Sequence, residues 1–174
     1  MCEKLSKEWN WAHYSAGELL RQEAATGSTL GVEISTYLTA GKIVPPELLM
    51  SLLKNSMESS QSTHVFLIDG FPRSLAQAVQ FEETVVHPKA VLYLNCTKEK
   101  MLDRCLARGQ DTGRADDNLT ALTTRYQQFL DVTLPVLDRY SHDSSVRVIE
   151  IDATQDKDTV YHQCQSHLSD YREI

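Results

Sequence analysis

Long apolar runs are missing from this sequence, and their absence argues against a membrane protein. No stretch approaches the roughly 18 consecutive apolar residues that a membrane-spanning helix needs. Residues 1–7 contain no apolar core of the secretory type. We therefore expect no membrane partner and a cytoplasmic location, although a segment preceding Met1 could carry a different address.

Positive charge is also scarce. The sequence has 17 Lys and Arg residues against 24 Asp and Glu residues, which gives a formal net charge of −7. General nucleic-acid binders depend on a positive field, so nucleic acid is not an expected partner. Any anionic ligand must instead be bound by a local cluster of cations.

Cysteine and histidine are present, but not in metal-binding patterns. The 4 cysteines are widely scattered with no C-x-x-C pair, and the 6 histidines show no ligand spacing. This distribution favours neither a disulfide framework nor a zinc knuckle. We therefore expect reduced, mostly buried thiols and no zinc.

The sequence does contain short apolar runs that alternate with helical periods, which is typical of βαβ units. The clearest strand, Val65–Ile68, is apolar on both faces and ends at a turn, as a strand buried between two helical layers should. We predict an α/β fold with a parallel sheet in a three-layer α/β/α arrangement. The predicted strands are 11–14, 65–68, 90–94 and 146–151.

Helix signals fill the intervals between these strands. Ser15 and Glu18 form a capping-box pattern, and Pro135 predicts a kink in the longest helix. The predicted helices cover 15–26, 28–40, 46 onward, 118–140 and 156–171. Because no repeat or long linker divides the chain, we expect a single domain over residues 1–174.

A polar turn, Asp69–Arg73, follows the clearest strand. Ligands of open parallel sheets bind at this carboxyl end. Gly70 lets the backbone approach a ligand closely, and the planar guanidinium of Arg73 suits phosphate oxygens. Asp69 could hold a magnesium ion or its water. The alternative is a plain strand exit with a solvated arginine.

Four further arginines lie close together in the second half of the chain. Residues 108–114 are predicted to form a loop with two glycines, and 116–118 to cap the next helix. In an acidic protein this pattern indicates a clamp on a polyanion that opens and closes. The alternative is ordinary pairing with the carboxylates of residues 116 and 117. The arginines are Arg104, Arg108, Arg114 and Arg125.

Four segments, in this order, resemble those of the nucleoside monophosphate kinases, and of adenylate kinases most closely. They are Ser15–Arg21, Gly41–Pro45, Ile68–Arg73 and Gly113–Asn118. Taken singly, Arg21 is an ordinary solvated helix residue and Gly41 a helix C-cap. The likeness runs over nearly the whole chain. It implies the P-loop kinase fold, a phosphotransferase that passes a phosphoryl group from ATP to AMP, and a monomer.

The resemblance also implies a role for each polar residue named above. Residues 15–44 would form the monophosphate-binding region and 107–117 a short lid without zinc. Mg²⁺ would accompany the co-substrate ATP, with Asp69 positioning it indirectly. Substrate binding is implied for Ala16, Arg21, Gly41, Val44, Gly70, Arg73 and Gln77; donor binding for Arg104, Arg108 and Arg114; catalysis for Asp69, Arg73, Arg108, Arg114 and Arg125.

Two positions bear on which base is used. Ala16 stands where uridylate-cytidylate kinases often carry alanine and adenylate kinases threonine. Gln77 matches the glutamine that reads adenine in adenylate kinases, and a carboxamide can both donate to and accept from the adenine edge. We weight Gln77 above Ala16, which favours AMP and leaves a uridylate-cytidylate kinase as the alternative.

The G-x-x-x-x-G-K-[ST] phosphate loop of these kinases does not occur in the sequence, nor does the strand before it. That strand would be the central one of the family's sheet, and its loss would leave open strand edges. The chain is then either a shortened form of a complete kinase or a degenerate family member. A degenerate member would fold with a gap in its sheet or with a strand borrowed from elsewhere. The intact arginines favour the first interpretation.

Three functions stay open at this point: an impaired adenylate kinase, a non-catalytic nucleotide-binding remnant, and a fragment that cannot fold. Phosphate-cradle interactions contribute a rate factor of about 10²–10³ each. We therefore expect the 174-residue chain to turn over several orders of magnitude more slowly than a complete relative.

Overall fold

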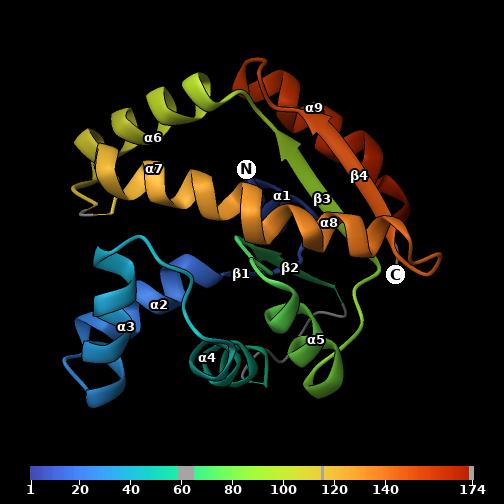
Figure 1. The fold of residues 1–174 in the computed structure, drawn as a ribbon. Coiled ribbons are helices and arrows are strands. Elements are labelled where there is room, and N and C mark those ends of the chain that lie inside the picture. The colour runs from blue at the N-terminus through green and yellow to red at the C-terminus, as the bar shows by residue number, and fades with distance from the viewer. Residues whose placement is uncertain (59–64, 115, 173–174) are drawn as a thin grey trace.

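The computed structural model describes residues 1–58, 65–114 and 116–172. One or more helices separate each strand from the next along the chain (Figure 1). The strands are β1 Ala12–Ser15, β2 Phe66–Asp69, β3 Ala90–Asn95 and β4 Arg147–Asp152. The helices are α1 Cys2–Trp9, α2 Ala16–Ala25, α3 Thr29–Thr39, α4 Pro46–Glu58, α5 Leu75–Thr84, α6 Lys98–Thr112, α7 Leu119–Gln128, α8 Leu134–Ser141 and α9 Lys157–Leu168, with a π-helical turn η1 Phe129–Thr133 and a 3₁₀ turn η2 Ser169–Tyr171.

The strands are parallel, as predicted, but within the described residues they form two separate pairs. β1 pairs with β2 from Ala12 opposite Phe66 to Ser15 opposite Asp69, and β3 pairs with β4 along their full lengths. Figure 1 shows β1 and β2 near the centre and β3 beside β4 at the upper right. The in-register ends of β1 and β2 bring the start of α2 next to the turn that follows β2.

Apolar layers cover both faces of the strands. One core contains residues of α1, β4 and α9, and Leu67 of β2 and Leu92 of β3 both pack against it. A second core joins α5, α8 and the start of β4, with Val91 of β3 packed on it. Neighbouring residues of β3 therefore face opposite cores, although none of its residues is fully buried and Leu94 and Asn95 are exposed. A third core, formed chiefly by α2, α3 and α4, supports the site described below.

The long helix predicted for residues 118–140 is interrupted before its proline. The N–H of Leu134 donates to the carbonyl of Phe129, five residues back, which defines the π-helical turn. Pro135 has no N–H to continue the usual ladder, so a local rearrangement at this point is expected. The predicted disruption takes the form of this π-helical turn, in which the Thr133 hydroxyl donates to the Arg73 carbonyl in the turn after β2; a kink of the helix axis stays a prediction.

The helix predicted to start at Ser15 is present, with α2 beginning at Ala16, but the predicted capping-box hydrogen bond is not formed. The Ser15 side chain makes no capping hydrogen bond. Glu18 instead accepts from Arg21 at 3.0 Å, because a guanidinium three residues along the same helix competes for its carboxylate. In the part of the chain that the structure describes, no helix combines the length and apolarity needed to cross a membrane.

Candidate functional site

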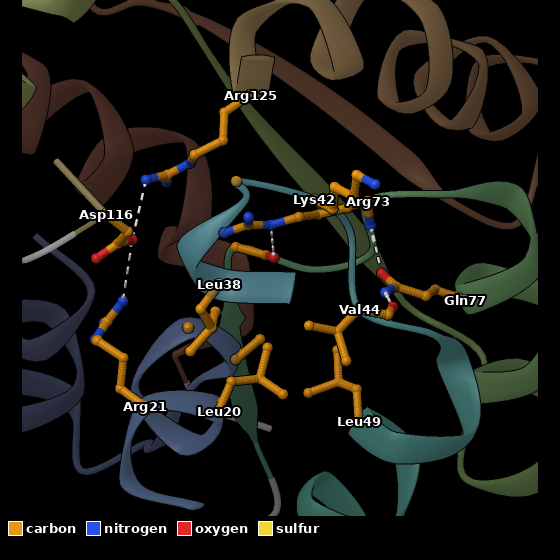
Figure 2. Close-up of a pocket in the computed structure, with 14 residues that line it drawn as sticks. Leu20, Arg21, Leu38, Lys42, Val44, Leu49, Arg73, Gln77, Asp116 and Arg125 are labelled. Carbon is orange, nitrogen blue, oxygen red and sulfur yellow. Dashed lines mark hydrogen bonds and ion pairs between the residues drawn. The ribbon is translucent and has the colours of Figure 1, made fainter. Parts of the chain in front are cut away.

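A pocket lies at the carboxyl ends of β1 and β2, the edge predicted to bind ligands (Figure 2). Its volume is about 40 Å³, well below the roughly 300–1,000 Å³ of occupied small-molecule sites, so a nucleotide could enter only if the walls move apart. The lining combines apolar side chains with three arginines. It comprises Ala16, Gly17, Leu20, Arg21, Leu38, Gly41, Lys42, Val44, Leu49, Gly70, Arg73, Gln77, Asp116 and Arg125.

The turn after β2 holds Arg73 in a fixed position. Gly70 has φ 69°, and a Cβ there would lie 3.1 Å from an Arg73 guanidinium nitrogen. The Arg73 Nε donates to the Gly70 carbonyl at 2.8 Å, and the Thr133 hydroxyl donates to the Arg73 carbonyl at 2.8 Å. The side chain of Arg73 is therefore held within its own turn, and its backbone is held by η1.

Arg73 is partly buried beside two further arginines. Removal of its guanidinium from water, together with the charges of Arg125 and Arg21, lowers the pKa of Arg73 to about 10. Within the described residues, no carboxylate lies within 4.0 Å of its guanidinium. A cation that is partly removed from water among like charges is stabilised by an anion, so this position favours binding of an anion.

Asp116 provides an internal carboxylate between two of these arginines. Its Oδ2 lies 3.2 Å from Arg125 Nη1 and 3.8 Å from Arg21 Nη1. Figure 2 shows the carboxylate between the two guanidinium groups. The sequence suggested two roles for this residue, a helix cap or an ion-pair partner of the nearby arginines, and the structure shows the ion pair with Arg125. In the structure it occupies the place where a ligand's phosphate could contact the same two cations.

The segment expected to be a loop with two glycines is mostly helical, which corrects the prediction for residues 108–114. α6 continues to Thr112, and only Gly113 adopts a left-handed conformation, at its end. Gly109 lies inside the helix, where an added Cβ would come 2.9 Å from the Cβ of Asp117. The glycine therefore allows the following segment to fold back on α6. Ala115, within the predicted lid, lies outside the described residues.

Arg108 and Asp117 join this segment to α6. The guanidinium donates to both carboxylate oxygens at 2.7 Å, and the Asp117 side chain is fully buried. Burial raises the pKa of Asp117, but Arg108, Arg125 and Arg114 outweigh it, so the pKa lies below its usual range. Arg114 lies 3.7 Å from Glu18 of α2. Arg108 and Arg114 thus stand next to the pocket without lining it.

Arg104 is separated from this group. Its guanidinium donates to the carbonyls of Ala153 and Gln155 at 2.5 and 2.6 Å, beyond the end of β4. It lines neither the pocket nor the second cavity described below. The structure therefore brings Arg21, Arg73 and Arg125 together and places Arg104 elsewhere.

Gln77 joins two walls of the pocket. Its Oε1 accepts from the backbone N–H of Arg73 at 2.8 Å, and its Nε2 donates to the carbonyl of Val44 at 2.9 Å. The residue is 1% exposed. Figure 2 shows both bonds. A carboxamide has a second N–H and a second lone pair, so a further polar partner in the pocket can still be accommodated.

A second cavity of about 390 Å³ adjoins the first. The two share Gly70, Arg73 and Arg125, so the arginines stand between them. Its walls come from β3, from the turn after β2 and from α6, α7, η1 and α8. Tyr93 and Phe129 stack there with ring centroids 6.0 Å apart. No sequence signal identified this cavity, because it depends on how distant elements pack.

Asp69 ends β2 and was expected to position magnesium. One of its oxygens lies 2.6 Å from His13 Nε2 on β1. Mg²⁺ is usually held by one or two carboxylates together with substrate phosphates and waters, and a single carboxylate at this sheet edge fits that donor set. His13 and Thr133 are contacts that the sequence did not single out.

A parallel α/β fold with arginines gathered at the carboxyl edge of its strands defines a protein that binds phosphorylated ligands. Residues 1–145 match the family model described as adenylate kinase. The chain belongs to the adenylate kinase family, and it is a nucleoside monophosphate kinase-type phosphotransferase by that membership.

The chain is similar to relatives of two kinds. It is 37% identical to a uridylate kinase of Saccharomyces cerevisiae, over 97% of this chain and 83% of the relative. It is 34% identical to adenylate kinase isoenzyme 1 of Rattus norvegicus, over 96% and 86%. A UMP-CMP kinase of Lentinula edodes is 37% identical over 97% and 78%. The similar proteins therefore divide between adenine and pyrimidine substrates.

Proposed function

We propose that this chain carries the acceptor site of an adenylate kinase, in which the γ-phosphoryl group of ATP passes to AMP to give two molecules of ADP. The observation that supports this best is the partly buried guanidinium of Arg73, which meets Arg21 and Arg125 at one pocket with an apolar floor. The arginines suit a phosphate, and the apolar walls suit a base.

Phosphoryl transfer requires positioning and charge neutralisation more than covalent help. In the proposed reaction an oxygen of the AMP phosphate attacks the γ-phosphorus, and the bond to the β–γ bridging oxygen breaks. Arg21 and Arg73 hold the acceptor phosphate, and Arg125, which lines both cavities, faces the group in transfer. Arg108 and Arg114 approach from the segment that Asp117 and Glu18 now hold. Closure of that segment excludes water, which would otherwise hydrolyse the donor.

Asp69 is proposed to hold Mg²⁺ through a water, and its bond to His13 fixes the orientation of its carboxylate. When bound, Mg²⁺ would neutralise charge on the donor phosphates. Arg104 was expected to lie over the donor base. Its two bonds to backbone carbonyls now support a second role for it, in fixing the segment that follows β4.

The second cavity is proposed to mark the place of the strand and phosphate loop that do not occur in these residues. β2 pairs with β1 and β3 with β4, and no strand joins the two pairs in the part of the chain that is described. Residues of β3 border the cavity on one side, and the turn after β2 borders it on the other. A strand placed between them would supply hydrogen bonds to both edges.

AMP binding tests the acceptor site directly. We expect AMP to bind the purified chain at a one-to-one ratio, and Asp116→Asn to tighten that binding by about 3- to 10-fold, because the substitution removes a negative charge from between Arg21 and Arg125. Isothermal titration calorimetry at constant ionic strength measures both dissociation constants.

The matched control is Asp138→Asn, which removes the same charge from an exposed position on α8. It should leave the AMP dissociation constant unchanged. Absence of AMP binding by the parent chain, or weaker binding by Asp116→Asn, would count against the acceptor site. Equal tightening by both variants would show an effect of net charge alone.

The choice of base is proposed to depend on Gln77. Asparagine is one methylene shorter and cannot reach both Val44 and Arg73, so Gln77→Asn should weaken AMP binding by about tenfold, the loss of roughly one hydrogen bond. UMP binding should change less. Competition titrations with the two monophosphates measure the difference.

A pyrimidine kinase is the second candidate, favoured by Ala16 in the pocket wall and by the uridylate kinase relatives. An equal effect of Gln77→Asn on AMP and UMP would remove the reason to prefer adenine. Tighter binding of UMP than of AMP by the parent chain would favour the pyrimidine kinase.

A further inference from the structure

Outside the arginine pocket, three side chains with metal-binding atoms meet where α1 packs against β1 and β2. Cys2 comes from α1, His13 from β1 and Asp69 from the end of β2. Their ligand atoms, the thiol sulfur, an imidazole nitrogen and a carboxylate oxygen, all lie within 4.8 Å of one another. It is the one such group of three or more among the described residues.

Each member of this group is partly buried and held by its own element. His13 lies opposite Leu67 in the β1–β2 ladder, two residues before Asp69, so the register brings its ring to the Asp69 carboxylate. The side chains of His13 and Asp69 are 19% and 36% exposed. Solvent can therefore reach the group, while the backbone positions are fixed by the strand pair and the helix.

The three ligand types together favour a particular class of ion. Thiolate, imidazole and carboxylate are all found around Zn²⁺, usually in a tetrahedral arrangement. Mg²⁺ and Ca²⁺ prefer sets made entirely of oxygen atoms, so the sulfur and the nitrogen select against them. Ligand atoms around tetrahedral zinc lie roughly 3–4 Å apart, as the bond lengths of about 2.0–2.3 Å require. The present separations need only side-chain rotation to reach that geometry.

We propose that Cys2, His13 and Asp69 form a binding site for a thiophilic divalent cation of the Zn²⁺ class, with three protein ligands and one position open to water. On binding, the Cys2 thiol proton passes to water and the sulfur binds as thiolate. The ion takes the place of the proton between His13 Nε2 and Asp69; by exchange through water this proton moves to Nδ1, so the imidazole binds the ion as a neutral ring. The site is distinct from the arginine pocket, whose lining contains none of its three residues.

If the proposed function is correct, metal binding at this site should also affect phosphoryl transfer. If Asp69 positions Mg²⁺ for phosphoryl transfer, the same carboxylate cannot also bind a thiophilic ion without moving. Such an ion would then inhibit transfer, and it would do so without competing with AMP for the arginines. The existence of the site does not depend on this consequence, because metal binding is measurable without any nucleotide.

Co²⁺ provides a spectroscopic probe for the site. We expect the reduced chain, titrated with Co²⁺ in a buffer free of phosphate and nucleotide, to develop a thiolate-to-metal charge-transfer band that saturates at one equivalent. Zn²⁺ should remove the band by displacement. Cys2→Ser should abolish it, and His13→Gln and Asp69→Asn should each weaken Co²⁺ binding by about tenfold or more.

Cys96→Ser is the matched control, because it removes a thiol outside the group and should leave the band unchanged. Each variant is first compared with the parent by far-ultraviolet circular dichroism. His13→Gln keeps all four thiols, so it tests the site even where Cys2→Ser unfolds. A parent chain with no band, a band that survives in Cys2→Ser, or undiminished affinity in His13→Gln would each overturn the proposal. AMP binding is measured separately, so its failure would not affect this result.

Discussion

Replacing Arg73 by methionine should weaken AMP binding by about 100-fold or more and leave the free energy of unfolding nearly unchanged. Hydrogen bonds between charged groups contribute about 1.5–3 kcal/mol each, and a guanidinium can make two to a phosphate. Stability should behave differently, because burial and the neighbouring arginines lower the pKa of Arg73 to about 10. A base with a lowered pKa in the folded state destabilises that state at every pH where it stays charged.

The two effects are separated by two measurements on the same protein. Calorimetry gives the AMP dissociation constant, and urea denaturation at pH 7 gives the free energy of unfolding, which should change by less than about 1 kcal/mol. Methionine keeps the apolar part of the side chain and removes only the charge and its bond to Gly70. A large loss of stability with unchanged AMP affinity would assign Arg73 a structural role.

Arg147→Met is the control for loss of a guanidinium. Arg147 is about half exposed on β4 and pairs with Asp170, an exposed ion pair of the kind that contributes little. Neither AMP affinity nor the free energy of unfolding should change appreciably in this variant. A comparable loss of affinity would indicate that the binding energy comes from overall charge, not from the pocket.

The strands could be predicted because a short apolar run that ends at turn residues is a local signal. Residues 65–68 and 90–94 are apolar on both faces, and the structure places β2 and β3 within one residue of the predicted limits. Turn chemistry also located the start of the pocket, since Gly70 adopts the positive φ that its position after a strand suggested. These features depend on only a few consecutive residues, so they can be predicted without knowledge of the tertiary contacts.

The end of α6 could not be predicted in the same way. Two glycines in seven residues indicate a loop, yet Gly109 is helical because Asp117 packs against it where a side chain would not fit. The pair of Arg108 with Asp117 depends on that tertiary contact. Arg104 and Arg108 are both on α6 and were predicted to act together, but Arg104 bonds to the carbonyl of Ala153 and Arg108 to Asp117.

The contacts that complete the site are also tertiary. Asp116 was predicted either to cap a helix or to pair with a nearby arginine, but nothing near it in the sequence indicates that Arg21 of α2 would lie on its other side. Thr133 was not predicted to contact the site. Pro135 indicated a disruption there, but only the π-helical turn aims the Thr133 hydroxyl at the Arg73 carbonyl, 60 residues away in the chain.

Replacing Glu82 by glutamine should cost about 2–3 kcal/mol of unfolding free energy, because it breaks charged hydrogen bonds that join α5 to α8. The carboxylate accepts from Arg139 at 2.6 and 2.8 Å and from the Tyr140 hydroxyl at 2.7 Å. Tyr140 is among the most buried side chains, so a weakened partner for its hydroxyl is not replaced by water. Glu83→Gln is the control, since Glu83 is the exposed neighbour on the same helix.

The contribution of Glu82 to the free energy of unfolding should decrease as the pH falls. Hydrogen bonds from Arg139 lower the pKa of Glu82, with Tyr140 adding to the effect and burial opposing it. An acid with a lowered folded pKa stabilises the protein above its unfolded pKa of about 4.3, and the stabilisation is lost as the pH falls through the folded value. Urea denaturation of parent and Glu82→Gln should therefore differ at pH 7 and converge in acid. A difference that does not depend on pH would mean that packing, not charge, explains the loss. Because α5 also carries Gln77, Glu82→Gln should weaken AMP binding slightly by loosening the contact between α5 and α8. The effect should be smaller than that of Gln77→Asn.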